Sequence, residues 1–216
     1  MFNALLATKD DQHEVAVTQI DKGALADSGV LVNVDYSTIN YKDALAVTAT
    51  APIIRKYPLV PGIDLAGTIE KSDDPDWQVG ERVVVNGWGM GEGHSGGLAQ
   101  YARVPASFLV KLPQNISTRH AMAIGTAGYT ASLCVDALEA QGVTPDHGDI
   151  LVTGASGGGR GDAAAVAAID SIGEGGSRRP RLRCILLVAP QRALGRAEPL
   201  AVDAVSYTHL TLPTIL

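Results

Sequence analysis

Cysteine and long apolar runs are both scarce in this sequence. Its two cysteines, Cys134 and Cys184, stand far apart and form no CxxC pair. The sequence therefore predicts neither a disulfide framework nor a structural zinc site. No apolar run reaches the roughly 20 residues that a membrane span needs, and the opening MFNALLATKDDQHE lacks the basic start and long apolar stretch of a signal peptide. We therefore expect a cytoplasmic protein with no membrane span.

Basic charge is also scarce, and it is unevenly distributed. Lys and Arg together number 17 against 23 Asp and Glu, a net charge of −6 that argues against nucleic acid as the main partner. Up to residue 159, ten basic residues stand against 18 acidic ones, whereas residues 160–216 hold seven Arg, no Lys and five acidic residues. Tyr207 is the only aromatic residue of that second part. The composition therefore changes near residue 160.

Short apolar runs separated by turn residues fill the first hundred residues. The stretch GVLVNVDYSTIN, residues 29–40, places Val30, Val32, Val34 and Tyr36 at every second position, which predicts a half-buried strand with these four side chains on one face. Other candidate strands, bounded by Gly, Asp and Pro, are residues 1–8, 64–71, 80–87 and 98–113, the last one interrupted by a proline. Many short strands at this spacing indicate a β-barrel or a β-sandwich.

The apolar spacing becomes helical at residue 117. Residues 117–140 carry apolar side chains three or four positions apart, and Ser117 or Thr118 is suited to cap the first turn. Gly125 and Gly128 interrupt this pattern, so we predict two helices joined there. An apolar strand and a turn, DILVTGAS, follow at residues 149–156. A β-domain followed by a helix, a strand and a glycine turn predicts two domains.

A glycine-rich turn follows that last strand. Glycine lets backbone amides approach a phosphate closely, and a helix beginning there would add its dipole. The strict G-x-G-x-x-G pattern is absent, so a tight turn without a ligand is the alternative. The charged residue that contacts the ribose should stand about 20 residues later, at the end of the next strand. The candidate for that strand, CILLVAP at residues 184–190, has no charged residue at its end, so the sequence does not distinguish NADPH from NADH. The turn comprises Gly154, Ala155, Ser156, Gly157 and Gly158.

The stretch NYKD, residues 40–43, is a second candidate for part of a site. Tyr41 can donate a proton, and Lys42 can bind a phosphate or stabilise an enolate. A solvated loop is the alternative, and the residues alone favour it. The glycine-dense segment 86–102 is more typical of the lip of a site than of a core.

Together these stretches resemble the medium-chain dehydrogenase/reductase superfamily. NYKD, YPLVPGIDLAGTI, GERVVVNGWGMGEGHSGGLAQYARV, AMAIGTAGYTA and DILVTGASGG are similar to its zinc-free quinone oxidoreductase branch, in the acryloyl-CoA reductase type, over about residues 1–158. The resemblance implies a GroES-like β-barrel, residues 1–115, followed by the truncated start of a Rossmann-type dinucleotide-binding domain, residues 116–158. It also implies NADPH as cofactor, a small substrate with an activated double bond, and a homodimer for an intact family member.

The resemblance also assigns site residues. It implies that Asn40 and Tyr41 border the nicotinamide and the reacting carbonyl, that Thr126 and Thr130 lie near the cofactor, and that residues 154–158 hold the pyrophosphate. Zinc alcohol dehydrogenases of the same superfamily place metal ligands where this chain has Asn40-Tyr41 and Gly62-Ile63-Asp64, so no metal is expected.

The reaction that the resemblance implies develops charge in a defined place. Hydride arriving at the β-carbon of an α,β-unsaturated carbonyl compound moves negative charge onto the carbonyl oxygen. A hydrogen-bond donor at that oxygen lowers the barrier, and we predict that Tyr41 is this donor. Either an acidic side chain or water then protonates the α-carbon.

The resemblance stops at Gly158. Residues 159–216 are rich in Arg, Ala, Gly and Pro, and their ending VSYTHLTLPTIL is similar to a translated sequencing-adaptor tail. We expect an aberrant, frameshifted and poorly ordered tail, with a divergent but genuine C-terminal segment as the alternative. A complete enzyme of this kind needs on the order of 300 residues. Two functions stay open: a reductase acting on acryloyl-CoA, a quinone or a small enone, and an inactive fragment or folded barrel without catalysis.

Overall fold

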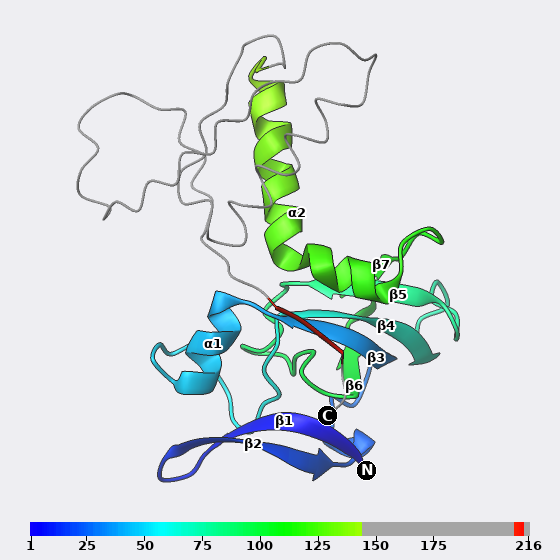
Figure 1. Cartoon of the computed structure of the whole chain (residues 1–216). Coiled ribbons are helices and arrows are strands. Elements are labelled where there is room, and N and C mark those ends of the chain that lie inside the picture. Colours follow the sequence, from blue (N-terminus) through cyan, green and yellow to red (C-terminus); the bar gives the residue numbers. More distant parts are fainter. Residues whose placement is uncertain (144–209, 214–216) are drawn as a thin grey trace, which may run out of the picture. The chain divides into compact units, whose positions relative to one another are not determined.

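The computed structural model describes residues 1–143 and 210–213 (Figure 1). The chain divides into two compact units, the first holding residues 1–126 together with the strand at 210–213, and the second beginning at residue 127. The predicted pyrophosphate turn, residues 154–158, lies outside the described residues, and so does the predicted tail apart from residues 210–213. The predicted domain limits therefore stay predictions.

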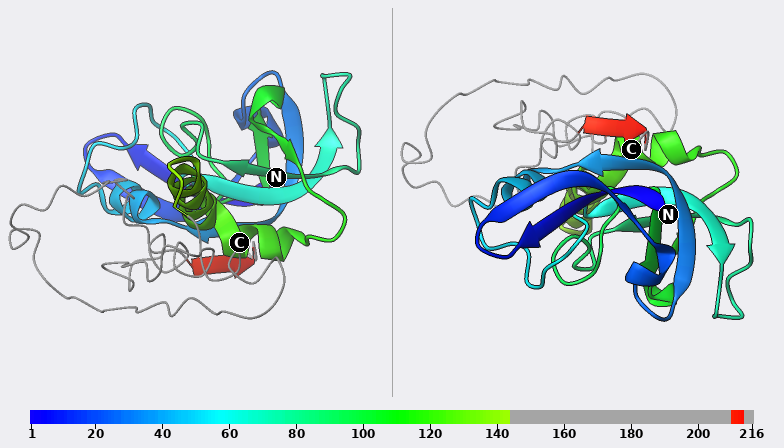
Figure 2. Two further views of the ribbon diagram at one scale, coloured as in Figure 1. Left: turned by 90° about the horizontal axis from the view of Figure 1, so that it is seen from above. Right: turned by 90° about the horizontal axis from the view of Figure 1, so that it is seen from below.

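The first unit is built from two antiparallel sheets. A hairpin of β1 (Phe2–Lys9) and β2 (His13–Ile20) forms the smaller one. The larger sheet has the strand order β6-β3-β4-β5-β7, with β8 also paired to β3. It lies between the hairpin and the first turns of α2 (Thr118–Ala140) in Figure 1, and Figure 2 shows it from above and below. Its strands are β3 (Val30–Ile39), β4 (Asp64–Lys71), β5 (Arg82–Asn86), β6 (Tyr101–Val104), β7 (Val110–Lys111) and β8 (Leu210–Pro213).

The strand β3 confirms most of the predicted alternation and departs from it at one residue. Val30, Val32 and Val34 are buried in the main hydrophobic cluster, as predicted. Tyr36 instead packs in a different cluster with Ala66 and with Ala121 and Met122 at the start of α2, so the prediction of one common face is wrong for Tyr36. The reason is a register shift between Val34, opposite Gly67, and Tyr36, opposite Ala66, because a bulge places an extra residue on β3.

The edge of β3 carries two short strands. The strand β6 pairs with the first part of β3, residues 30–33, and β8 pairs with residues 36–39. Ile39 stands opposite Leu210, so β8 reaches the residue just before Asn40. The described part of the predicted tail thus completes a sheet edge.

The segment after β3 is a helix, α1 (Tyr41–Thr48), so the interpretation of NYKD as a loop is wrong. Asn40 is the residue before the first helical turn, and the Asp43 carboxylate accepts the Asn40 backbone N–H at 2.8 Å. An acidic residue three positions after Asn is half of a capping box, and this signal was present in the sequence. Ala49 ends the helix with a φ of 53°.

The helix α2 (Thr118–Ala140) has the predicted interruption. Gly125, with φ 53° and ψ −166°, breaks its helical geometry, which confirms two helices joined at this glycine. Ser117 accepts the His120 N–H at 3.1 Å through its side chain and so caps the first turn. By length and composition alone, α2 could cross a membrane. This is weak evidence for a membrane span, because the core helix of a water-soluble protein meets the same criteria.

Candidate functional site

A fully buried carboxylate, Asp64, organises the polar centre of the first unit. It is the first residue of β4, and its side chain accepts hydrogen bonds from residues far apart in the chain. Asn40 Nδ2 donates to Oδ2 at 2.9 Å, and Asn86 Nδ2 donates to Oδ1 at 2.9 Å. Thr126 donates its backbone N–H to Oδ2 at 2.9 Å and its hydroxyl to Oδ1 at 2.5 Å. Four donors therefore compensate the burial of one carboxylate.

This network brings together two of the residues that were predicted for the site. Asn40 stands at the junction of β3 and α1, and Thr126 follows the kink in α2. Asp64 was noted only as a position where related enzymes have a metal ligand, and its role as the shared acceptor was not predicted. A charged residue at the edge of the apolar run LAGTI was the available signal, because a buried charge must find partners.

Asp43 forms a second buried carboxylate beside the first. Its Oδ1 accepts the Ile63 N–H at 2.9 Å, and its Oδ2 accepts the Asn40 N–H and lies 3.4 Å from Asn40 Nδ2. Burial raises the pKa of the Asp43 carboxyl to about 6; the hydrogen bonds from Asn40 and Ile63 oppose this rise, and the charge of Asp64 adds to it. Asn40 Oδ1 is buried and has no hydrogen-bond partner within the described part of the chain.

Asp43 should make stability depend on pH in the direction opposite to an ordinary paired acid. The folded state binds this proton more tightly than the unfolded state, because the pKa rises from 3.8 to about 6. The contribution of Asp43 to the free energy of unfolding is therefore fully present below pH 3.8 and is lost as the pH rises through 6. The loss amounts to on the order of 3 kcal/mol. We expect urea unfolding between these pH values to show this slope in the difference between the wild type and Asp43→Asn.

The matched control for that measurement is Asp73→Asn, at a solvent-accessible carboxylate on the same unit. Other acids titrate in both proteins and cancel in the difference. A wild-type minus Asp43→Asn difference that stays constant with pH would contradict the raised pKa.

The other predicted site residues are more scattered. Tyr41 is the first residue of α1 and is about half exposed, so its hydroxyl is accessible. Thr130 lies further along α2, in the second unit. The glycine-dense segment 86–102 is not a lip throughout, because Met90 is fully buried in the main hydrophobic cluster. Trp88 of this segment is exposed and stacks on Phe108, with ring centroids 5.1 Å apart.

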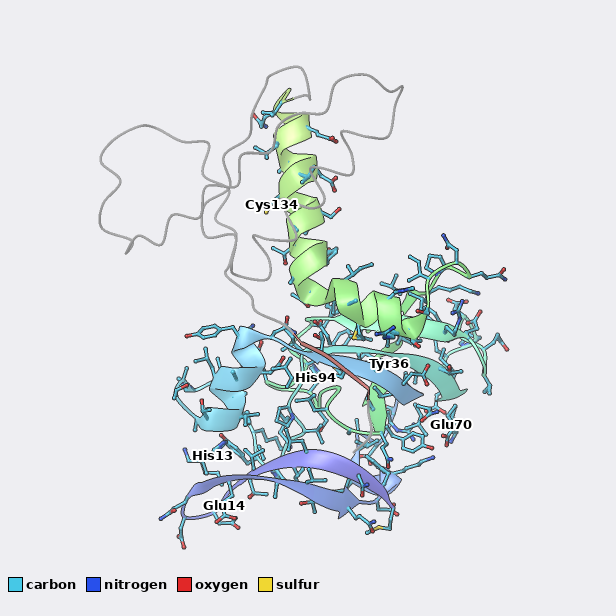
Figure 3. All side chains as sticks on the ribbon, in the orientation of Figure 1. His13, Glu14, Tyr36, Glu70, His94 and Cys134 are labelled. Carbon is cyan, nitrogen blue, oxygen red and sulfur yellow. The ribbon has the colours of Figure 1, made fainter. Side chains whose placement is uncertain are left out.

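His13 connects the β1–β2 hairpin to the far end of α1 (Figure 3). Its Nε2 lies 3.0 Å from the Val47 carbonyl oxygen, and its Nδ1 lies 3.2 Å from the Tyr57 hydroxyl. One ring nitrogen thus satisfies a carbonyl at the helix C-terminus, where such groups lack intrahelical partners. His13 therefore supports the helix that carries Tyr41.

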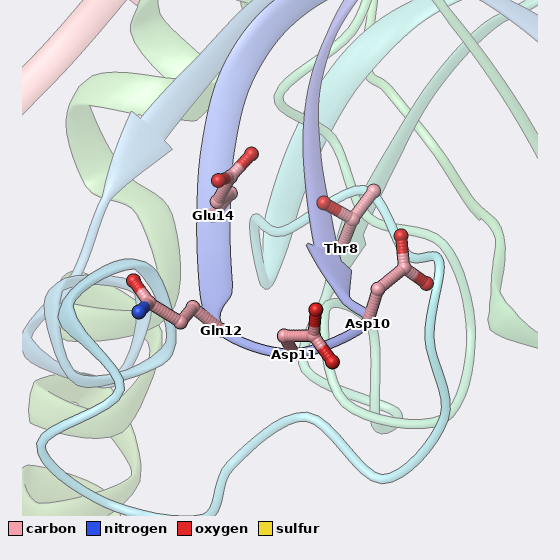
Figure 4. Close-up of a pocket in the computed structure, with 5 residues that line it drawn as sticks. All are labelled: Thr8, Asp10, Asp11, Gln12 and Glu14. Atoms are coloured by element: carbon pink, nitrogen blue, oxygen red, sulfur yellow. The ribbon is translucent and has the colours of Figure 1, made fainter.

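An acidic depression of about 300 Å³ lies at the turn between β1 and β2 (Figure 4). Among the described residues, no group of three or more His, Cys, Asp or Glu side chains is arranged to hold a metal ion. We therefore read this depression as a solvated turn, and the predicted absence of a metal stays a prediction. The lining residues are Thr8, Asp10, Asp11, Gln12 and Glu14.

Comparison with known proteins finds one matching family model, the alcohol dehydrogenase GroES-like domain, at residues 26–114. The probable acrylyl-CoA reductase AcuI of Escherichia coli (strain K12) is 51% identical over 154 residues, which are 71% of this chain and 48% of that protein. The acrylyl-CoA reductase AcuI of Ruegeria pomeroyi is 52% identical over 161 residues, 73% of this chain and 49% of that protein. The putative quinone oxidoreductase YhfP of Bacillus subtilis is 48% identical over 159 residues, 73% of this chain and 48% of that protein.

Solved structures give the same result. The yhdH oxidoreductase of Salmonella enterica in complex with NADP matches with a TM-score of 0.76 and 46% identity, over 78% of this chain and 52% of that one. E. coli YHDH with bound NADPH matches with a TM-score of 0.74 and 48% identity, over 78% and 52% of the two chains. The yhfP protein of Bacillus subtilis with NAD bound matches with a TM-score of 0.76 and 46% identity, over 79% and 52%. The chain spans about half the length of the curated relatives it matches.

Proposed function

Because this chain belongs to the medium-chain dehydrogenase/reductase superfamily through its GroES-like domain, we propose that it carries part of an NADPH-dependent reductase of α,β-unsaturated carbonyl compounds. The observation that carries the proposal is the hydrogen bonding of Asn40 and Thr126, both expected near the cofactor, to the same carboxylate of Asp64. The relatives named acrylyl-CoA reductase and the structures with NADP or NADPH support it. A cytoplasmic homodimer acting on a small molecule follows as part of the proposal.

Asn40 supplies an observation that fits a nicotinamide cofactor. Its Nδ2 is committed to Asp64, whereas its buried Oδ1 has no hydrogen-bond partner among the described residues. Leaving a buried acceptor unpaired costs about 1–3 kcal/mol, and the amide N–H of a carboxamide group would pair with it. NADPH, when bound, supplies the hydride. Asn40 would hold its carboxamide, Thr126 and Thr130 would lie near it, and residues 154–158 would hold its pyrophosphate.

Tyr41 is the proposed donor to the substrate carbonyl. Its side chain is exposed next to the buried Asn40, so its O–H is free to donate to a bound carbonyl oxygen. Such a donor acts mainly on the charge that develops in the transition state. The α-carbon then takes its proton from an acidic side chain or from water.

The test uses a completed chain in which residues 1–158 precede the remaining part of the E. coli relative. We expect it to oxidise NADPH when acryloyl-CoA, a quinone or a small enone is added. Tyr41→Phe should lower kcat about 10- to 100-fold and change the KM for NADPH much less, because the lost bond forms only in the transition state. Tyr101→Phe, on β6, is the matched control. An unchanged kcat in Tyr41→Phe would remove Tyr41 from the mechanism.

A folded β-domain without catalysis is the second candidate for the chain as it stands. The observation that favours it is coverage, since the chain spans 48% and 49% of the two AcuI relatives. We expect calorimetric titration of the purified chain with NADPH to detect weak binding or none. A dissociation constant in the low-micromolar range would show that the chain builds a working cofactor site, and this second candidate would be rejected.

A further inference from the structure

The outer edge of the β1–β2 hairpin carries backbone groups that pair with nothing in the described part of the chain (Figure 1). On the inner side, Leu5 of β1 donates its N–H to the Leu98 carbonyl oxygen at 2.9 Å, away from β2, and Ala7 repeats this orientation. Val17 and Val15 of β2 stand opposite these two residues of β1. Opposite residues in an antiparallel ladder exchange both of their hydrogen bonds or neither. The N–H and carbonyl groups of Val17 and Val15 therefore point outward, and those of the other odd-numbered residues of β2 do the same.

This edge lacks the features by which proteins protect exposed strands from pairing. The larger sheet ends in short strands, four residues in β6 and two in β7, whereas β2 has eight. The register of β2 against β1 is continuous over the whole strand, with no bulge to bend it. The strand contains no Lys, Arg or Pro, and the side chain at its centre, Val17, is 56% exposed. A long, unbroken and partly apolar edge is suited to accept another strand.

We propose that β2 is a self-pairing surface, at which two copies of this chain associate through antiparallel β2 strands centred on Val17. Antiparallel pairing brings the same residues together across a twofold axis, so one surface serves both copies. With Val17 on the axis, Val15 faces Gln19 of the second copy. All of these residues have outward backbone groups, so each facing pair exchanges two hydrogen bonds. Glu14 faces Ile20, so no like charges meet within the paired strands.

The distribution of charge selects the antiparallel direction over the parallel one. Residues 10–14, at the turn between β1 and β2, carry three acids. At the other end of β2 the charges are balanced, because the Met1 amino group pairs with Asp21 and Lys22 pairs with Glu70. Parallel pairing would place two acidic turns side by side. Antiparallel pairing separates them by about 20 Å or more, which exceeds the Debye length of about 8 Å at physiological salt.

The interface lies within one strand and needs neither a cofactor nor the rest of a reductase. The experiment is sedimentation velocity of the full chain at concentrations from about 5 to 500 µM, the range in which a small interface associates. We expect a monomer–dimer equilibrium with a dissociation constant on the order of 10–100 µM, because one strand edge buries less surface than a standard interface.

Val17→Pro should raise this dissociation constant about tenfold or more, because both hydrogen bonds at the twofold axis are lost. The removed N–H points outward, and edge strands tolerate proline at such positions, so the hairpin is expected to stay folded. Val17→Lys should have the same effect, because two cations would face each other across the axis. Val110→Lys is the matched control, since Val110 is a valine of similar exposure on β7. It should leave the association unchanged.

Amide hydrogen exchange locates the interface along the strand. The amides of Val15, Val17 and Gln19 should exchange quickly in dilute protein and slowly in concentrated protein. Those of Ala16 and Thr18 face β1 and should be protected at every concentration. The proposal would be overturned by a chain that stays monomeric over the whole range, by a dimer that Val17→Lys leaves intact, or by outward amides whose exchange is independent of concentration.

Discussion

Replacing Asp64 with alanine is expected to lower the free energy of unfolding of the first unit by about 3–5 kcal/mol, because breaking a buried charge network leaves its partners unpaired. The carboxylate is fully buried and accepts bonds from Asn40, Asn86 and twice from Thr126. Alanine removes all four acceptor contacts and leaves a cavity. Urea unfolding followed by tryptophan fluorescence measures the effect, since Trp77 packs against the main hydrophobic cluster.

Asp64→Asn tests whether charge or shape matters more. The amide keeps the volume but turns one oxygen into a donor that faces other donors. At Oδ1 the Thr126 hydroxyl can rotate to accept, and the Asn86 amide can turn its oxygen inward. We therefore expect Asp64→Asn to cost about 1–3 kcal/mol, less than alanine. Asp73→Ala, at an accessible acid, should be nearly neutral. An Asp64→Ala cost below that of Asp64→Asn would contradict this account.

Gly67→Ala is expected to prevent folding or to cost more than about 4 kcal/mol, a loss that single substitutions reach only when backbone or core geometry is violated. A Cβ at Gly67 would lie 2.0 Å from the Asn33 carbonyl oxygen and 3.0 Å from Val32 Cγ1. The first of these atoms belongs to the backbone of β3, the strand paired with β4 at this point. It cannot move without separating two central strands of the larger sheet.

Gly93→Ala is the matched control for Gly67→Ala, because a Cβ there meets no atom within 4 Å. Both variants add one methyl group, so a difference in their folding reflects the room available for a Cβ at each position and not the change from glycine to alanine itself. We expect circular dichroism and the yield of soluble protein to be normal for Gly93→Ala and strongly reduced for Gly67→Ala. Equal behaviour of the two variants would show that β3 and β4 can separate to admit the methyl group.

Local patterns predicted the strands better than the site. Alternating valines in β3 and short apolar runs bounded by turn residues specify strands, because each strand buries one face. The kink of α2 was visible as Gly125. The helix α1 was missed because its capping signal, Asn40 with Asp43 three residues later, follows directly on a strand. The pairing of Asp64 with Thr126 joins residues 62 positions apart, and no local pattern encodes such a closure.

The bulge in β3 decides which way the chain faces when it reaches Asn40. Before the bulge, the even-numbered residues Val30, Val32 and Val34 point into the main hydrophobic cluster. After it, the parity is inverted, and Tyr36 shares the other face of the sheet with Ala66. Asp64 lies two residues before Ala66 on the same strand, so it too belongs to that face.

After the bulge, the even-numbered residues point to the other face of the sheet. Asn40, like Tyr36, is one of them, so its side chain reaches Asp64 and not the valines of the main hydrophobic cluster. Without the bulge, regular alternation along β3 would direct the Asn40 side-chain amide into the main hydrophobic cluster. The one extra residue near Asp35 therefore shifts the phase of the alternation. The first part of β3 contributes valines to the core, and its end presents a polar side chain to Asp64.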